Sequence, residues 1–190
     1  MKSALRKAIR YSINKMTEAE RLSQSLCVCR LLAANTAWQQ AHDILLYAAL
    51  PDEVDLSSLF AEDKCIWLPV VDGDTLRIRQ YVAGKTSISS GFHIEEPTAD
   101  APELQDAEYS RIQLAIIPGR AFTLSGHRMG RGKGYYDRLL TKLKCPTLGV
   151  CFDCQIVEDL PMDPWDKKLD GVIYPSSLTQ TYPSSLSPNH

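Results

Sequence analysis

The sequence predicts an α/β protein: a single domain with an open, mostly parallel sheet and helices on both faces, in a Rossmann-like, three-layer arrangement. Short and almost wholly apolar runs, such as Leu114–Ile117, are typical of parallel strands that are buried on both faces. Segments with a helical spacing of apolar residues separate these runs. The 190 residues, of which 44% are hydrophobic, suffice for one sizeable core and are marginal for two.

The first sixty residues contain the start of this pattern. Residues 1–15 are expected to form a helix. Thr17-Glu-Ala-Glu20 is a capping box, which predicts a second helix that begins there and runs to about Trp38. The continuous apolar run Ile44–Leu50 ends at a proline and predicts a buried parallel strand, and Asp55–Glu62 predicts a short helix.

The middle of the chain combines strands with a long connection. Lys64–Val71 predicts a strand that ends in a turn at Asp72-Gly-Asp. Thr75–Val82 alternates apolar residues with arginines, as a strand with one solvated face does. Gly84–Ser110 is rich in Gly, Ser, Pro and acidic residues, which predicts a long loop that is functional or mobile.

The second half of the chain repeats the alternation of strand and helix. The expected elements are a buried strand, a helix and two more strands: Leu114–Ile117, Gly134–Leu143, Thr147–Phe152 and Val172–Tyr174. The residues after the last strand are rich in Ser, Thr and Pro. We therefore expect one domain over 1–175 and a polar, flexible tail over 176–190.

Composition excludes several classes of protein. The net charge of −2 does not favour a chain that binds nucleic acid or a membrane surface through many cations. The longest apolar runs are far shorter than the roughly 20 residues of a membrane-spanning helix. No apolar segment of a secretory signal follows the basic start of the chain. We expect a cytoplasmic monomer that acts on small molecules, with no nucleic-acid and no membrane partner.

The six cysteines are expected to pack in the core, because free cysteine is among the most buried residue types. The alternative is a zinc site formed by Cys27, Cys29, Cys151 and Cys154.

Ligands of open α/β sheets bind beyond the carboxyl ends of the strands, where loops begin. Three segments occupy such positions: Pro51–Asp55, Pro118–Gly134 and Phe152–Val157. The second of these contains three glycines that alternate with two cationic residues, in the order Gly130, Arg131, Gly132, Lys133 and Gly134.

Alternating glycines let backbone N–H groups approach an anion without obstruction by Cβ atoms. The following helix directs its positive end to the same place, and Arg128 adds a further cationic donor. Asp137, one helical turn beyond Lys133, is well placed to hold Mg²⁺ on a bound phosphate. The residues alone therefore favour a phosphate cradle.

The spacing matches neither the Walker A loop, which needs Ser or Thr where Gly134 stands, nor the dinucleotide fingerprint. Two alternatives stay open. The segment is a solvated basic loop that needs glycines for its turns, or a nucleic-acid patch in which Tyr135 and Tyr136 stack on bases.

The run Gly126–Asp137 resembles the signature of the 5-formyltetrahydrofolate cyclo-ligase (methenyltetrahydrofolate synthetase) family. Other parts of the chain are similar to further motifs of this family: Lys2 with Arg6, Asp52–Asp55, Lys85-Thr86 followed by Glu-Pro, and Gln155–Pro161 followed by Trp165-Asp166 and Asp170. The resemblance implies an enzyme that converts 5-formyltetrahydrofolate, with ATP as co-substrate and Mg²⁺ as cofactor, into 5,10-methenyltetrahydrofolate, ADP and phosphate. It implies that the formyl oxygen attacks the γ-phosphate and that a neighbouring amine then closes the ring.

The resemblance also implies roles for individual residues. Lys133 and Arg131 would be catalytic, Glu53 and Tyr135 would bind the folate, and Asp137 and Asp170 would hold Mg²⁺. ATP would be bound by Lys2, Arg6, Arg128, Met129, Gly130, Arg131, Gly132, Lys133, Gly134, Tyr135 and Tyr136.

These roles have structural alternatives. Lys2 and Arg6 would otherwise lie on a solvated helix end, Glu53 would serve the loop or cap the helix after it, and Asp170 would be a surface acid.

Some positions depart from the family pattern. Arg120 stands where the family usually has an aliphatic residue, Thr123 where Asp is common, Met129 where Leu is usual and Trp165 where His is frequent. The alternative function is therefore a relative that binds ATP and acts on a different small molecule.

Overall fold

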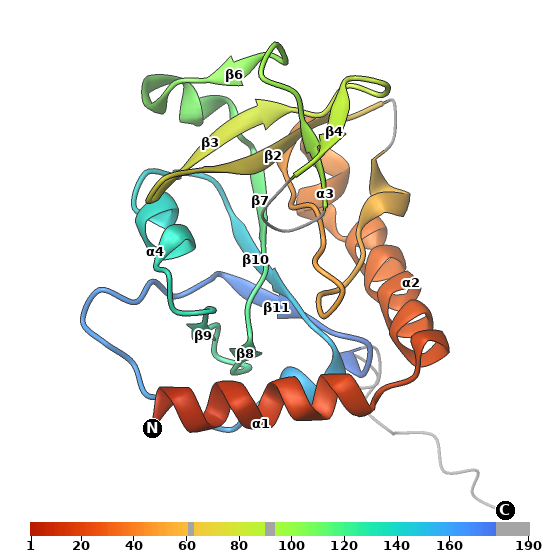
Figure 1. The fold of residues 1–190 in the computed structure, drawn as a ribbon, viewed down its shortest axis with the longest axis vertical. Helices are drawn as coiled ribbons and strands as arrows, with labels where there is room; N and C mark the ends of the chain where they lie inside the picture. Colours follow the sequence, from red (N-terminus) through yellow and green to blue (C-terminus); the bar gives the residue numbers. More distant parts are fainter. Residues whose placement is uncertain (61–62, 90–93, 178–190) are drawn as a thin grey trace, which may run out of the picture.

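The computed structural model describes residues 1–60, 63–89 and 94–177. Within these residues a seven-stranded sheet has the strand order β11-β10-β7-β1-β2-β3-β6 (Figure 1). Its strands are β1 (Asp43–Leu45), β2 (Cys65–Asp72), β3 (Thr75–Gln80), β6 (Glu103–Leu104), β7 (Leu114–Ile117), β10 (Thr147–Val150) and β11 (Gly171–Ile173). The five strands from β11 to β2 are parallel, and β3 and β6 pair antiparallel at one edge. The predicted fold class is confirmed.

Alternate residues of the central strands point into two separate cores. Ile44 and Leu46 pack in the core that contains apolar residues of α1 (Lys2–Lys15), α2 (Glu18–Ala34) and α3 (Thr36–Gln40). Leu45, between them, packs in the core that contains Leu139 of α4 (Tyr135–Leu140). The helices therefore cover opposite faces of the sheet, which makes three layers (Figure 1).

The capping box forms as predicted, but the helix that it starts is shorter than expected. The Thr17 side chain accepts a hydrogen bond from the Glu20 backbone, and the Glu20 carboxylate accepts one from the Thr17 N–H. α2 ends at Ala34, and the side chain of the next residue, Asn35, caps α3 by accepting a hydrogen bond from the Ala37 N–H at 2.9 Å. The predicted single helix to Trp38 is therefore two helices, because an asparagine favours a cap over a helix interior.

The apolar run Ile44–Leu50 forms a strand only over its first part. β1 ends at Leu45, and the Leu46 N–H still donates to the Trp67 carbonyl at 2.9 Å. Beyond that point the chain leaves the sheet, and residues such as Tyr47 and Leu50 line a cavity. The run is apolar because it forms the wall of a pocket as well as a strand.

The predicted helix Asp55–Glu62 is only a 3₁₀ turn, η1 (Ser57–Leu59), and Glu62 lies outside the described residues. The expected long loop Gly84–Ser110 also differs from the prediction. It contains β4 (Thr86–Ile88) paired with β5 (Glu95–Pro97), then β6 and the start of η2 (Asp106–Arg111), while residues 90–93 lie outside the described part. Strands of two or three mostly polar residues are too short to show a periodic pattern.

A small hairpin that the sequence did not predict organises the glycine-rich segment. β8 (Ala121–Phe122) pairs antiparallel with β9 (Arg128–Met129). This pairing places the residues just after β7 beside the start of the glycine-rich segment. α4 is shorter than the predicted Gly134–Leu143. η3 (Asp153–Gln155) follows β10 and packs against α1.

The predicted division into a domain over 1–175 and a tail over 176–190 stays a prediction, since 178–190 lie outside the described residues. In the described part of the chain, no helix combines the length and apolarity needed to cross a membrane.

Candidate active site

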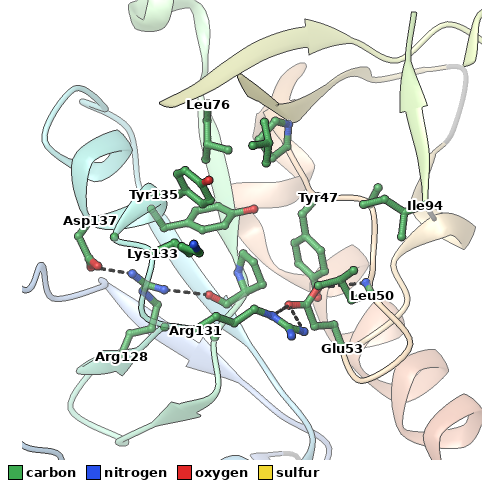
Figure 2. A pocket seen from close by; sticks show the side chains of 18 of the residues that line it. Tyr47, Leu50, Glu53, Leu76, Ile94, Arg128, Arg131, Lys133, Tyr135 and Asp137 are labelled. Carbon is green, nitrogen blue, oxygen red and sulfur yellow. Dashed lines mark hydrogen bonds and ion pairs between the residues drawn. The ribbon is translucent and has the colours of Figure 1, made fainter. Parts of the chain in front are cut away.

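A cavity of about 340 Å³ lies beyond the carboxyl ends of β1, β2 and β7 (Figure 2). Its volume is within the range of small-molecule sites. One wall is apolar and consists of Tyr47, Leu50, Pro69, Val71, Leu76 and Ile94. The opposite wall is polar and includes most of the predicted site residues: Arg128, Gly130, Arg131, Lys133, Gly134, Tyr135, Tyr136 and Asp137. Glu53 lies across from them, beside Tyr47 and Leu50 (Figure 2).

The glycine-rich loop, Gly130–Gly134, forms the polar wall because two of its glycines adopt backbone angles that other residues avoid. Gly132 has φ +103° and Gly134 has φ +69°, both in the left-handed region. These two turns leave the intervening side chain of Lys133 in the cavity, near Tyr135 (Figure 2). In the described part of the chain the Lys133 ammonium group has no hydrogen-bond or ion-pair partner, which leaves it free for a ligand.

Arg128 is buried and is committed to contacts inside the protein. Its Nη2 donates to Asp137 Oδ1 at 2.6 Å, and its Nη1 donates to the Pro118 carbonyl at 3.2 Å. Its guanidinium carbon lies 5.7 Å from the centre of the Tyr136 ring. Burial raises the pKa of Tyr136 above its ordinary value, so this hydroxyl stays protonated. Arg128 therefore connects α4 to the residue after β7, and its predicted contact with ATP stays a prediction.

Arg131 reaches across the cavity to the acidic segment, Asp52-Glu53, which follows β1. Its guanidinium pairs with Asp52 and with Glu53 Oε1, the latter at 2.9 Å (Figure 2). Burial raises the pKa of Asp52, but the guanidinium groups of Arg131 and Arg120 outweigh that effect and hold it below the ordinary value. Asp52 is therefore ionised at neutral pH.

Glu53 also shapes its own loop. Its Oε2 accepts a hydrogen bond from the Leu50 N–H at 3.1 Å, and its own N–H donates to the Leu50 carbonyl at 2.9 Å. Glu53 does not cap the turn η1, whose N-cap is Leu56, and it is Asp55 Oδ1 that accepts a hydrogen bond from the Ser57 N–H at 2.9 Å. These contacts fix the Glu53 carboxylate at the edge of the cavity.

The two tyrosines at the start of α4 have different environments. Tyr136 packs against the core that contains Leu139. Tyr135 lies on the cavity wall, where its hydroxyl donates to the Gly73 carbonyl in the β2–β3 turn at 3.1 Å. The Arg138 guanidinium lies 5.5 Å from the centre of the Tyr135 ring. Tyr135 therefore offers a positioned aromatic surface to a ligand.

The amino-terminal helix reaches the glycine-rich loop from outside the cavity. Arg6 Nε donates to the Gly130 carbonyl at 2.8 Å. Lys2 Nζ pairs with Asp163 and Asp166, each at 2.6 Å. Burial lowers the pKa of Lys2, but the two carboxylates outweigh it and hold the pKa above the ordinary value. Lys2 therefore stays protonated, and its charge is balanced by two carboxylates of the segment before β11.

The structure does not bring Asp170 to the cavity. This residue precedes β11, at the amino ends of the strands, and its Oδ2 accepts from the Thr147 N–H at 2.8 Å and hydroxyl at 2.9 Å. The Met129 side chain packs in the core, so its predicted contact with ATP, which stays a prediction, would have to come from the backbone. Asp170 binds the first residue of β10 at the amino ends of the strands, whereas Asp137 lines the cavity beyond their carboxyl ends. The predicted pair of metal ligands therefore does not form.

No three Cys, His, Asp or Glu side chains of the described residues converge as a metal site, and the four cysteines of the alternative zinc site are free thiols. Asp137 nevertheless fits Mg²⁺, which typically binds one or two carboxylates together with substrate phosphates and water. Asp137 lies on the cavity wall one turn beyond Lys133, and its Oδ1 carries the contact with Arg128.

Sequence reasoning missed several residues of the site. The apolar wall comes from four separate segments, so no local pattern marks it. Glu96 of β5 also lines the cavity, where burial raises its pKa. Arg120, which the sequence analysis noted only as a departure from the family, is buried and pairs with Asp52 at 2.5 Å. A charged residue three positions after a wholly apolar strand was the available signal for this contact.

Comparisons with known proteins all point to one family. The model of the 5-formyltetrahydrofolate cyclo-ligase family matches residues 1–175. The chain is 28% identical to a probable 5-formyltetrahydrofolate cyclo-ligase of Schizosaccharomyces pombe, over 93% of this chain and 96% of that protein. It is 30% identical to the 5-formyltetrahydrofolate cyclo-ligase of Escherichia coli, over 73% and 80% of the two chains.

The fold is also similar to a solved structure of a named enzyme. The NMR structure of 5,10-methenyltetrahydrofolate synthetase from Aquifex aeolicus matches with a TM-score of 0.80 and 32% identity, over 90% of this chain and 88% of that one. The match of the family model to nearly the whole described chain, together with these relatives, shows that the chain belongs to the 5-formyltetrahydrofolate cyclo-ligase family.

Proposed function

We propose that this protein is a 5-formyltetrahydrofolate cyclo-ligase, which uses ATP to convert 5-formyltetrahydrofolate into 5,10-methenyltetrahydrofolate, ADP and phosphate. The observation that carries the proposal is the unpaired ammonium group of Lys133, which lies in a cavity between a glycine-rich loop and an apolar wall. A free cation in such a site suits a phosphate group that is transferred to a partner whose ring has apolar faces.

The nucleotide half of the site would be the glycine-rich loop. The backbone N–H groups of Gly130–Gly134 can approach phosphate oxygens because no Cβ atoms intervene at the glycines. Lys133 would neutralise charge on the γ-phosphate, and Arg6 would support the loop through the Gly130 carbonyl. The six residues of α4 form a short helix, so side-chain cations would contribute more than the helix dipole.

The folate half would be the apolar wall together with Glu53 and Tyr135. A pterin ring is flat, with apolar faces and an edge of N–H donors. The Tyr135 ring and the side chains of Leu76 and Ile94 supply surfaces for the faces. The Glu53 carboxylate would accept hydrogen bonds from the donor edge, as a charged acceptor in a partly buried site does effectively.

The chemistry would need no covalent bond between protein and substrate. The formyl oxygen attacks the γ-phosphorus as the bond from that phosphorus to ADP breaks. The nearby amine nitrogen of the folate then attacks the former formyl carbon and loses its proton, and the phosphate leaves with the oxygen. Lys133 and Arg131 would stabilise the charge that moves during the first step, and the cavity would hold the two reactants in line.

Mg²⁺ is the cofactor that this arrangement would use, with Asp137 as the protein ligand. When bound, the ion would neutralise part of the phosphate charge and orient the leaving group. Asp170 has no part in this proposal, because its carboxylate is engaged with Thr147.

The alternative of a different small-molecule substrate rested on Arg120 and Thr123. Among the described residues, neither lines the cavity. Thr123 is buried, where its hydroxyl contacts Ser125 and the His127 N–H. We therefore propose one function only. The monomeric state and cytoplasmic location stay predictions, which size-exclusion chromatography and cell fractionation would check.

The test is a spectroscopic assay of the purified protein with 5-formyltetrahydrofolate, ATP and Mg²⁺, in which the near-ultraviolet absorbance of the methenyl product is followed. Product should appear only when the folate, ATP and Mg²⁺ are all present. A flat trace from folded protein that binds ATP would refute the proposed substrate. Equal product without ATP would refute the phosphoryl-transfer chemistry.

A further inference from the structure

Arg120 is a buried cation that the proposed chemistry does not use. Its side chain is 9% exposed, and its Nη1 lies 2.5 Å from Asp52 Oδ2. A guanidinium group is costly to bury unless a carboxylate compensates its charge. Arg120 comes directly after Pro118-Gly119 at the end of β7, and Asp52 belongs to the acidic segment after β1. The ion pair therefore joins the loops that follow two adjacent parallel strands.

The backbone of Arg120 is held rigidly. Its N–H donates to the Met129 carbonyl at 2.7 Å, within the β8–β9 hairpin. Its carbonyl accepts from Gln155 Nε2 at 3.1 Å, and the Gln155 side chain also donates to the Gly119 carbonyl at 2.8 Å. Gln155 itself is only 2% exposed. The guanidinium of Arg120 therefore projects from a fixed base and gives the acidic segment a defined position.

Asp52 is shared between two arginines that differ in exposure and attachment. Its Oδ2 faces Arg120, and its Oδ1 faces Arg131. The Arg131 side chain is 34% exposed and belongs to the glycine-rich loop. Arg131 also pairs with Glu53, so the cluster holds two cations and two carboxylates in balance. Of the two arginines, Arg131 is the one that lines the cavity.

The balance of this cluster changes if Arg131 turns toward a phosphate. Asp52 then keeps Arg120 as its counter-ion, and Glu53 is released to accept hydrogen bonds from another ligand. Without Arg120, Asp52 would have Arg131 as its sole cation within the cluster and would hold it more tightly.

We propose that Arg120 is a positioning residue that anchors Asp52 and so leaves Arg131 free to exchange between the acidic segment and the nucleotide phosphates. The inference rests on the proposed function, because it assigns Arg131 to phosphate and Glu53 to folate. It predicts that folate and nucleotide bind cooperatively, since each ligand takes one partner of the Arg131–Glu53 pair and releases the other.

The test compares four proteins: wild type, Arg120→Met, Arg120→Lys and the double variant Arg120→Met/Asp52→Asn. Arg120→Met leaves Arg131 as the sole counter-ion of Asp52 within the cluster, so the affinity for ATP and kcat should each fall roughly tenfold. Arg120→Lys keeps the charge and should recover most of that loss. The double variant removes the excess carboxylate together with the cation, and it should bind ATP more tightly than Arg120→Met alone.

The double variant distinguishes positioning from packing. If Arg120 served only to fill space, the second substitution would add a further defect, and the double variant would be no better than Arg120→Met. That result, or an unchanged ATP affinity in Arg120→Met, would overturn the inference. Thermal unfolding of each variant would show whether a loss of ATP affinity comes from unfolding. If Arg120→Met is unfolded, the ATP affinity of Arg120→Lys relative to wild type becomes the deciding comparison.

Nucleotide affinity is measured by titration calorimetry without folate, so it does not depend on turnover. A wild-type protein that bound ATP but made no methenyl product would refute the proposed substrate. The ATP affinities of the four proteins would still test whether Arg120 releases Arg131. A repeat of the titration with saturating 5-formyltetrahydrofolate tests the coupling. The folate should raise the ATP affinity of wild type, and it should raise that of Arg120→Met by a smaller factor.

Discussion

The glycine-rich loop and the amino-terminal helix each carry a lysine for which the sequence suggests the same role, but the two lysines differ in their surroundings. Lys133 lies in the cavity, and its ammonium group has no partner in the described part of the chain. Lys2 lies outside it and contacts two carboxylates at 2.6 Å. The loop therefore presents an uncompensated charge, whereas the helix uses its charge to attach itself to the segment before β11.

This difference separates a binding function from a structural one. An unpaired cation contributes little to stability and is available to a ligand, whereas a cation in an ion pair must break that pair first. Arg131 lies between these extremes, because it is paired but partly exposed. Residues of the same charge, within one proposed site, should therefore respond differently to substitution.

The largest effect is expected for Lys133→Ala. Loss of the free ammonium group should reduce kcat/KM by roughly a hundredfold or more, as the removal of a group that stabilises developing charge does. The free energy of unfolding should change by less than about 0.5 kcal/mol, because Lys133 makes no described contact through its ammonium group. The spectroscopic assay and urea unfolding measure the two quantities.

Lys144→Ala is the matched control, because Lys144 is another lysine of the chain and lies beyond α4, away from the cavity wall. It should retain wild-type turnover. Turnover of Lys133→Ala within about threefold of wild type would show that the loop cation does not take part.

A smaller effect is expected for Gly132→Ala, which tests the shape of the loop. An alanine at φ +103° is strained by about 1 kcal/mol or more, and the loop should relax away from the phosphate-binding shape. KM for ATP should rise roughly tenfold. Gly84→Ala is the control, since Gly84 also has a positive φ, of +79°, and a Cβ atom there would have no neighbour within 4 Å among the described residues. It should cost similar stability and leave KM for ATP unchanged, and equal KM values for both variants would contradict the role of the loop.

Lys2→Met should have a small effect on catalysis and a measurable one on stability. The substitution removes both contacts with the carboxylates, and a partly exposed pair contributes up to about 1 kcal/mol. We expect kcat to stay within about threefold of wild type. A loss of activity as large as that of Lys133→Ala would contradict the contrast between loop and helix.

The smallest effect is a pH dependence of stability that comes from Asp166. Burial raises the pKa of Asp166, but the Asp163 N–H and the Lys2 ammonium group outweigh it, so the pKa is below the ordinary value. A carboxyl group of this kind stabilises the fold above the unfolded pKa of about 3.9, and the contribution is lost as pH falls through the folded value. Unfolding free energies below about pH 4 should therefore fall more steeply for wild type than for Asp166→Asn, and parallel curves would refute the pairing.

Local signals in the sequence predicted the elements that depend on local causes. Leu114–Ile117 has the bounds of β7 because a wholly buried strand needs an unbroken apolar run, and the Thr17–Glu20 capping box marks the start of α2. The run Ile44–Leu50 was predicted as one long strand because burial in a pocket wall and burial in a sheet require the same residues.

The part of the site that depends on local properties of the chain was also predicted. The glycine spacing identified the loop, since the left-handed angles of Gly132 and Gly134 are local properties. The pairing of Arg131 with Asp52 was not predictable, because the two residues are 79 positions apart and meet only through the order of the strands. Asp170 was assigned by resemblance alone, and the fold places it at the amino ends of the strands.

Transfer of the γ-phosphoryl group to the formyl oxygen is the step on which the proposed roles of Lys133, Arg131 and Glu53 all depend. The direct measurement uses 5-formyltetrahydrofolate labelled with ¹⁸O in the formyl group, and mass spectrometry of the phosphate released with the methenyl product. We predict that the label appears in the phosphate, one atom for each turnover. Unlabelled phosphate from labelled folate would contradict the attack of the formyl oxygen on ATP, and with it the proposed use of this cavity.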